Sequence, residues 1–193
     1  PNITGVSTMS DFDGLIRLVQ FIHPEVKTVG TVFTPAEINS VAYKNRLEQA
    51  AGKKGIRLLA VPANTATEVL DAANSLAAQR IDAFCQISDN LTSSTGSAIL
   101  KVSKNSKIPY YGFVTQQVEQ GAVAVCARDN FQAGYEAGQM GIAVLSGQDP
   151  SRMPFRFVQK TVYLLSAGNA KFFSIPLSDK LLTAFPTLII SNK

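Results

Sequence analysis

Small polar side chains occur at three places where an apolar run has just ended. Asn39 and Ser40 follow "TVGTVFT", Asp89 and Asn90 follow "DAFCQIS", and Thr115 follows "IPYYGFV". These side chains offer hydroxyl, amide and carboxylate groups, which bind a small polar ligand through hydrogen bonds and one negative charge. The set contains no nucleophile paired with a base, so its chemistry favours binding over catalysis.

Residues that commonly hold metals or act as nucleophiles are scarce. The single histidine, His23, precedes Pro24, and both Cys85 and Cys126 lie inside apolar runs. Neither cysteine belongs to a CxxC pair or a metal-ligand cluster, and free cysteine in such a run is usually a small buried hydrophobe. The glycine signatures of nucleotide sites and the GxSxG elbow of hydrolases are also missing. We therefore expect no enzyme activity, no metal and no cofactor.

Composition narrows the class of protein further. The 193 residues are 46% hydrophobic and 17% charged, which suits one compact domain or one domain with a short appendage. The net charge is +4, but the Lys and Arg residues are spread along the chain, so no nucleic-acid-binding arm is expected. No apolar stretch approaches the roughly 18 residues of a membrane helix, and the first residues lack the organisation of a signal peptide.

The elements that would position the polar residues alternate regularly. Apolar runs predict strands at 28–34, 56–63, 82–88, 108–114 and 122–127. Amphipathic spacing predicts a first helix that is capped by Ser10 and a second helix at 38–54. A third helix is predicted to follow the capping box of Thr65 and Glu68, and a fourth to span 92–106. A short helical turn is predicted at 115–121, and a last helix, capped by Asn130, at 131–147. The glycine-rich stripe of that last helix predicts close packing on the sheet. This alternation predicts an α/β fold, a doubly wound, Rossmann-like parallel sheet.

In such a sheet the ligand crevice lies beyond the carboxyl ends of the strands. We therefore expect Asn39, Ser40, Asp89, Asn90 and Thr115 to form a ligand site at one rim. The alternative is that all five are ordinary helix caps, because these residue types are preferred there. The sequence leaves both interpretations open.

Several short motifs, in order, resemble one family. "PNITGVS", "GTVFTPAEINSVA", "ISDN", "IPYYGFV" and "GQMGIAVLSGQDPSRMP" occur in the succession typical of the substrate-binding proteins of bacterial ABC transporters, in the branch that includes binders of tryptophan and other aromatic amino acids. The resemblance covers nearly the whole chain. It implies the fold of type I periplasmic binding proteins, in which two α/β lobes close on a ligand.

The resemblance also implies roles for the candidate residues. Asn39 and Ser40 would hold a ligand carboxylate, Asp89 would pair with an α-amino group, and Thr115 could bridge either. The family's "TDN" stretch reads "SDN" here, because Ser88 stands in place of the threonine.

Mapped onto that plan, residues 8–150 resemble the second lobe, and residues 151–193 resemble a crossover and a C-terminal fragment of the first lobe. Most of the first lobe would then be missing, so the absent signal peptide carries no information about location. The resemblance implies a periplasmic or extracellular protein that works with a membrane permease, with a lipoprotein anchor as an option. Without the first lobe, residues 157–193 would expose apolar segments. They are therefore expected either to fold back on the core or to mediate a homodimer.

The same lobe would also suit a ligand-sensing domain of a larger membrane receptor. The sequence does not separate sensing from transport.

Overall fold

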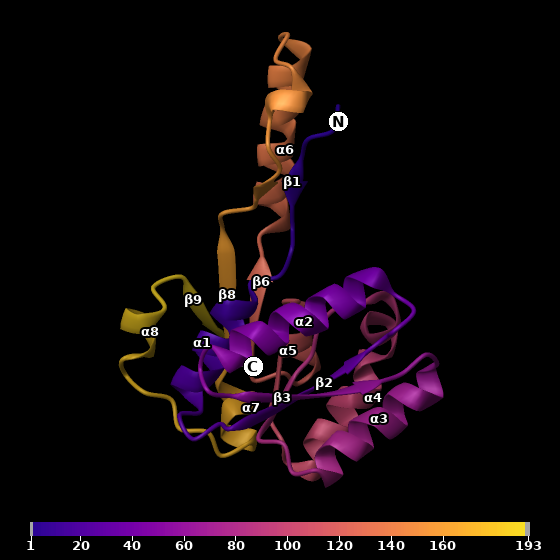
Figure 1. Ribbon diagram of the computed structural model, residues 1–193. Coiled ribbons are helices and arrows are strands. Elements are labelled where there is room, and N and C mark those ends of the chain that lie inside the picture. Colours follow the sequence, from indigo (N-terminus) through magenta and orange to yellow (C-terminus); the bar gives the residue numbers. More distant parts are fainter. Residues whose placement is uncertain (1, 192–193) are drawn as a thin grey trace.

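The computed structural model, which describes residues 2–191, contains a mostly parallel sheet with helices on both faces and a separate two-stranded ribbon (Figure 1). The sheet has the order β3-β2-β4-β5-β6-β8-β9. Its strands are β2 (Thr28–Phe33), β3 (Arg57–Pro62), β4 (Ala83–Cys85), β5 (Tyr110–Gly112), β6 (Ala124–Arg128), β8 (Thr161–Ser166) and β9 (Leu188–Ser191). Neighbouring strands are parallel except β6 and β8, which confirms the predicted α/β fold class.

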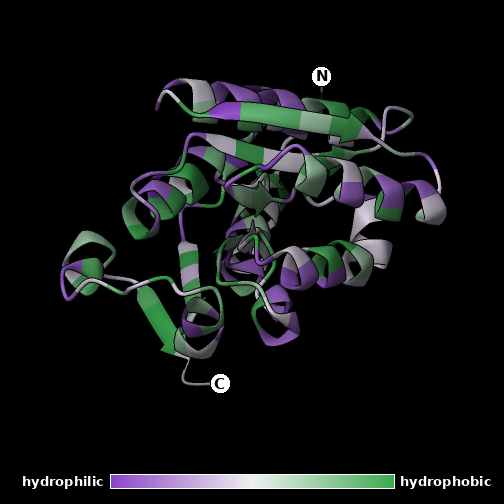
Figure 2. Cartoon of the chain, turned by 90° about the horizontal axis from the view of Figure 1, so that it is seen from below, coloured by the Kyte–Doolittle hydropathy of each residue, from purple (hydrophilic) through white to green (hydrophobic). Residues whose placement is uncertain are grey.

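Helices cover both faces of this sheet. They are α1 (Phe12–Ile22), α2 (Ile38–Gly52), α3 (Ala66–Ala78), α4 (Asn90–Ser106), α5 (Gln116–Gln120), α6 (Asn130–Leu145), α7 (Ala167–Phe172) and α8 (Leu181–Ala184), with a 3-10 turn at Pro150–Arg152. One buried cluster contains Leu15 of α1 and Leu47 of α2, and a second contains Leu76 of α3 and Ile99 of α4. Hydrophobic residues are accordingly concentrated along the strands, while hydrophilic residues recur along the helices (Figure 2).

Strand β4 shows why its sequence carries a continuous apolar run. Phe84 packs in the cluster on one face of the sheet and Cys85 in the cluster on the other, and both are fully buried. A strand covered on both faces needs apolar residues at every position, as expected in a doubly wound sheet. On neighbouring β2, Gly30 allows close approach of a helix, because a Cβ there would lie 2.5 Å from Cδ1 of Ile81 and 3.2 Å from Cδ2 of Leu76.

Two helix starts differ from the prediction by one residue. Asp11, not Ser10, caps α1, since its Oδ1 accepts a hydrogen bond from the amide of Gly14 at 2.9 Å. Asp129, not Asn130, caps α6 by accepting from the amide of Gln132 at 2.9 Å. In each case two capping-type residues are adjacent, and the aspartate makes the capping bond.

Helix α6 does not pack on the sheet as its glycine-rich stripe predicted. It projects from the rest of the molecule beside β1 (Val6–Ser7), which pairs in parallel with β7 (Arg156–Phe157) (Figure 1). We call residues 2–7 and 130–158 the arm, and residues 12–128 and 161–191 the body. Of the residues in α6, Ala133 and Met140 are buried, whereas Phe131 is 84% exposed and Leu145 is 90% exposed. The predicted apolar stripe therefore faces solvent.

The C-terminal segment folds back on the core, which is one of the two outcomes expected for residues 157–193. The resemblance implied a crossover and a fragment of the first lobe for residues 151–193, whereas β8 and β9 extend the same sheet as β6. β8 lies antiparallel to β6, with Arg128 opposite Thr161 and Ala124 opposite Leu165. Tyr163 and Phe185 are buried in the same cluster as α1, so residues 161–191 complete the body instead of leaving it.

Candidate functional site

A hollow of about 220 Å³ lies at the carboxyl ends of β4, β5 and β6, beside the connections from the body to the arm. We call it the rim hollow. Its polar lining residues are Thr8, Ser10, Ser88, Thr115, Gln116, Arg128 and Asn130. Phe113 and Val114 add apolar surface. The position matches the rim at which a parallel sheet is expected to bind ligands.

Thr115 is the member of the predicted set that lines this hollow. It precedes α5 but makes no side-chain capping bond, so it is not an ordinary helix cap. Its hydroxyl donates to Oε1 of Gln116 at 3.2 Å, within the same wall of the hollow. A half-buried hydroxyl in this place can donate to or accept from a ligand.

Ser40 and Asp89 are brought together, but below the surface. Oδ1 of Asp89 accepts from the amide and the hydroxyl of Thr92 at 2.7 and 2.6 Å, and Oδ2 accepts from Oγ of Ser40 at 2.5 Å. Asp89 is only 2% exposed. It forms the capping box of α4 together with Thr92. Asp89 is therefore a helix cap, as the alternative interpretation of the five polar residues expected. Its role toward an amino group stays a prediction.

Asn39 and Asn90 lie at the surface near that pair. Asn90 is held by Glu37, whose carboxylate accepts from the amide and Nδ2 of Asn90 at 3.0 and 2.8 Å and from the amide of Leu91 at 3.2 Å. The first N–H groups of α4 therefore already have an anionic partner within the chain. Asn39 is exposed, and the described residues provide no hydrogen bond to its side chain. Neither asparagine lines the rim hollow.

Among the lining residues outside the predicted site, Ser88 and Arg128 bear most directly on ligand binding. The Oγ atom of Ser88 is buried and has no partner within residues 2–191. Arg128 lines the hollow with a side chain that is 16% exposed. Arg128 ends β6 just as the predicted residues follow their strands, so the same strand-end rule applied to "AVAVCA" would have found it.

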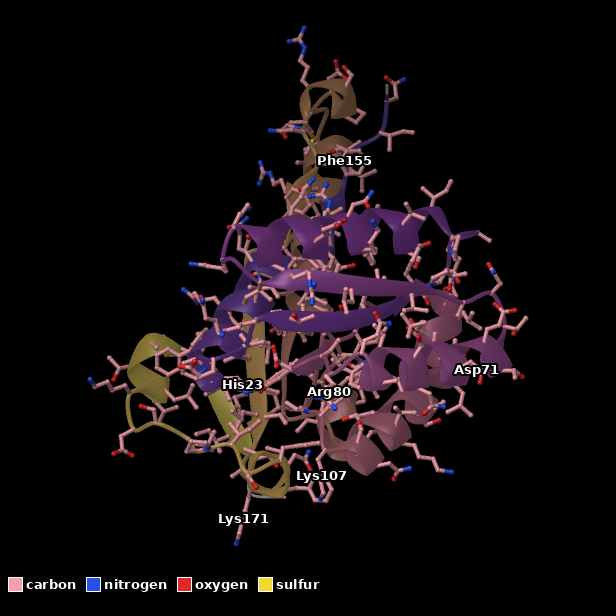
Figure 3. All side chains as sticks on the ribbon, turned by 60° about the horizontal axis from the view of Figure 1, so that its bottom comes forward. His23, Asp71, Arg80, Lys107, Phe155 and Lys171 are labelled. Atoms are coloured by element: carbon pink, nitrogen blue, oxygen red, sulfur yellow. The ribbon has the colours of Figure 1, made fainter. Side chains whose placement is uncertain are left out.

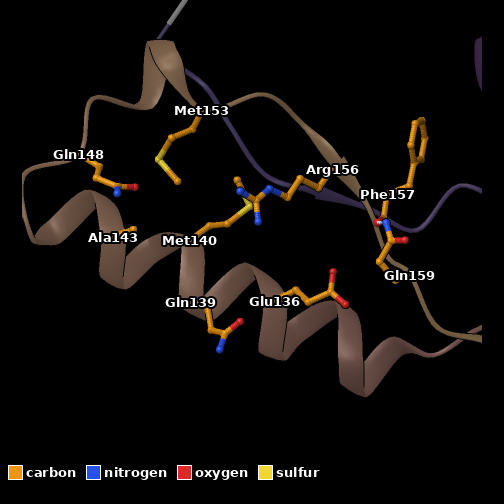
Figure 4. A pocket seen from close by; sticks show the side chains of 9 residues that line it. All are labelled: Glu136, Gln139, Met140, Ala143, Gln148, Met153, Arg156, Phe157 and Gln159. Carbon is orange, nitrogen blue, oxygen red and sulfur yellow. Dashed lines mark hydrogen bonds between the residues drawn. The ribbon is translucent and has the colours of Figure 1, made fainter.

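A second hollow of about 470 Å³ lies in the arm (Figure 4). It is bounded by Glu136, Gln139 and Met140 on α6 and by Met153 and Arg156 on the facing segment. Although larger, it contains none of the polar strand-end residues, and it lies where α6 has only a two-stranded ribbon against it. We therefore take the rim hollow as the candidate ligand site.

The two cysteines are buried and free, as their apolar runs predicted. Burial raises the pKa of both thiols, that of Cys126 to about 12, which makes them poor nucleophiles. Within the described part of the chain, no group of three or more His, Cys, Asp and Glu residues could hold a metal ion.

Basic side chains such as Lys107 and Lys171 lie at the end of the molecule away from Phe155 of the arm (Figure 3).

The chain is similar to known proteins in sequence and in fold. The family model described as ABC transporter substrate binding protein matches residues 1–187. A tyrosine-binding protein from Clostridioides difficile is 29% identical over 170 residues, which are 88% of this chain and 49% of that protein. The chain therefore spans about half the length of this curated relative.

Solved structures agree on the fold. A conserved domain protein from Vibrio cholerae superposes with a TM-score of 0.84 at 26% identity, over 97% of this chain and 63% of that one. An ABC domain from Streptococcus pneumoniae, solved in complex with L-Trp, also gives 0.84, at 24% identity, over 97% and 65%. Since the family model matches nearly the whole chain, the protein belongs to the ABC transporter substrate-binding protein family.

Proposed function

We propose that the full-length protein containing this chain is the solute-binding component of an ABC uptake transporter, and that its ligand is an amino acid, with aromatic side chains favoured. Family membership carries the proposal. The name of the Clostridioides difficile relative and the L-Trp bound to the Streptococcus pneumoniae domain direct it toward aromatic amino acids. The polar lining of the rim hollow supports a ligand that carries polar groups.

The rim hollow is suited to be one wall of a larger site. Its volume of about 220 Å³ is below the roughly 300–1,000 Å³ of complete small-molecule pockets. We infer that the body is one lobe of the full-length protein and that the arm reaches toward the other. The division then runs between body and arm, because residues 161–191 share the sheet of residues 28–128.

Within the predicted site, the residues take different roles in this proposal. Thr115 contacts the ligand from the hollow, and Asn39 is free to do so from its exposed position. Ser40 and Asp89 hold the rim in shape through their buried hydrogen bond. Asn90 fixes the start of α4 through Glu37.

The proposal includes a cellular location and a partner protein. A binding protein of an uptake system meets its ligand in the periplasm or outside the cell and delivers it to a membrane permease. No helix among residues 2–191 is both long and apolar enough to cross a membrane.

Calorimetric titration of the full-length protein tests the proposal. Tyrosine, tryptophan and phenylalanine should bind with dissociation constants on the order of micromolar or tighter, and leucine more weakly. Glucose serves as a control, because it is a small polar ligand without a carboxylate or an amino group. Binding of glucose and of no amino acid would overturn the proposal.

The 193-residue chain by itself provides a second test. If one wall of the cleft is missing, it should bind the same amino acids with dissociation constants of about a millimolar at best. Micromolar binding by the monomeric chain would contradict the two-lobed arrangement while leaving amino-acid binding intact.

A further inference from the structure

The charge of the rim hollow differs from the one that the sequence suggested. Asp89 was predicted to provide a negative charge for an amino group, but it does not line the hollow, and both of its oxygens accept hydrogen bonds within the chain. Among the residues that line the hollow, Arg128 is the one that carries a charge. The hollow is therefore suited to an anionic group.

Arg128 is held in place from two sides. Its Nε donates to the carbonyl oxygen of Met9 at 2.9 Å, and its Nη1 donates to Oγ1 of Thr161 at 2.6 Å. Met9 belongs to the first connection between arm and body, and Thr161 begins β8. A guanidinium fixed at two of its nitrogens presents the third in a defined direction. Within residues 2–191, Nη2 has no hydrogen-bond partner.

The positive charge is only partly compensated inside the chain. The carboxylate of Asp11 lies 3.9 Å from Nη1, beyond hydrogen-bonding distance. Its Oδ1 caps α1, and its Oδ2 lies 3.4 Å from the hydroxyl of Thr161. Because the Arg128 side chain is 16% exposed and its ion pair with Asp11 is long, its charge is only weakly compensated. A ligand anion in the hollow would provide a closer partner.

We infer that Arg128 binds the carboxylate of the ligand through Nη2, and that the buried hydroxyl of Ser88 donates a second hydrogen bond to it. This inference rests on the proposed function, since it assigns one group of an amino-acid ligand to this wall. Charge-assisted hydrogen bonds from arginine to a carboxylate are stronger than neutral ones. The amino group and the side chain of the ligand then face the other lobe.

Tyrosine and tyramine, which lacks the carboxylate, provide the test. Calorimetry on the full-length protein should show tyrosine binding about tenfold or more tightly than tyramine. In Arg128→Gln, tyrosine should lose about tenfold or more in affinity, while tyramine stays within about twofold, so that the preference disappears. Equal affinity of the unaltered protein for the two ligands would overturn the inference without any variant.

Two matched variants separate ligand binding from support of the connections. Thr161→Val removes the partner of Nη1 but keeps the charge, so the preference for tyrosine should persist. Arg128→Lys also keeps a charge and should retain part of the preference. If Arg128→Gln binds tyrosine as well as the unaltered protein does, the inference fails and the proposed function stands. If the unaltered protein binds no amino acid, the proposed function fails, and the inference with it.

Discussion

Ser40 donates a hydrogen bond to Asp89 across 2.5 Å, and this contact joins the first turn of α2 to the N-cap of α4. The same Oγ accepts from the amide of Thr34 at 2.8 Å, so it also fixes the loop that follows β2. Both residues are buried. Two of the polar residues that the sequence placed at the rim thus stabilise one another.

We predict that Ser40→Ala lowers the free energy of unfolding by about 1–3 kcal/mol, because it leaves a buried oxygen of Asp89 and the amide of Thr34 without their partner. Urea unfolding followed by circular dichroism measures the change. The neighbouring Asn39→Ala is the control, since Asn39 is exposed and should stay within about 0.5 kcal/mol. Equal stability of the two variants would refute the prediction.

Gln86 is a second buried polar residue with a structural task. Its Oε1 accepts from the amide of Val32 at 2.9 Å, and its Nε2 donates to the carbonyl oxygens of Val32 and Ile87 at 2.8 and 2.9 Å. The ladder between β2 and β4 pairs only Val29 and Gly30 with β4. Beyond the end of this ladder, the side chain of Gln86 makes the hydrogen bonds with the backbone of β2 that β4 does not make.

We predict that Gln86→Met lowers the free energy of unfolding by about 2–4 kcal/mol, because methionine fills the volume but satisfies none of these backbone groups. The same urea titration measures it. Gln79→Met, on the exposed end of α3, is the matched control and should change stability little. An unchanged midpoint for Gln86→Met would show that water replaces the lost bonds.

Stability should fall at alkaline pH. Burial, followed by the charge of Asp11, raises the pKa of the Cys126 thiol from 9.0 to about 12, and burial raises the pKa of Tyr163 from 10.0 to about 12. Between those values the unfolded chain releases protons that the folded chain keeps, so the folded state loses stability as the pH rises. The full contribution is present below pH 9.0, the ordinary thiol value.

Urea unfolding at about pH 8 and about pH 11 measures this slope. Cys126→Ala removes one of the titrating groups and should make stability less dependent on pH over this range. An equally steep slope in that variant would mean that the other buried groups, chiefly the tyrosines, carry the dependence.

The regular alternation of strands and helices could be predicted because each element signals itself locally. The runs that became β2, β4, β5 and β6 are rich in buried apolar residues, as strands covered on both faces require. The sheet order and the antiparallel pairing of β6 with β8 have no local signal, since Arg128 and Thr161 pair across a long stretch of chain. The sequence therefore left the C-terminal segment with two possible outcomes, folding back on the core or forming a dimer.

The periodicity of apolar residues predicted the helix α6 but not its position relative to the sheet. The spacing of its apolar residues predicted a helix correctly, but an apolar stripe does not state what covers it. At the site, the strand-end rule found Thr115, which lines the hollow, and Ser40 and Asp89, which lie beneath the rim. The rule also applies to Arg128, which ends β6, but it was not used there; only the contacts of its side chain with Met9 and Thr161 have no local signal.

The exposed apolar residues of α6 lead to the last prediction. Ile142 is 65% exposed and Leu145 is 90% exposed, on a helix that has little of the chain against it. Large apolar patches of this kind drive association. We predict that the 193-residue chain self-associates through α6, and that Ile142→Lys combined with Leu145→Glu makes it monomeric in light scattering.

The competing route is the homodimer expected through the C-terminal segment. β9 is the edge strand of the sheet, and its Ile189 is 57% exposed, so edge pairing between two copies would use it. Ile189→Lys should leave association unchanged if α6 is the contact. If Ile189→Lys gives the monomer and the α6 variant does not, association runs through β9, where Ile190 is also exposed.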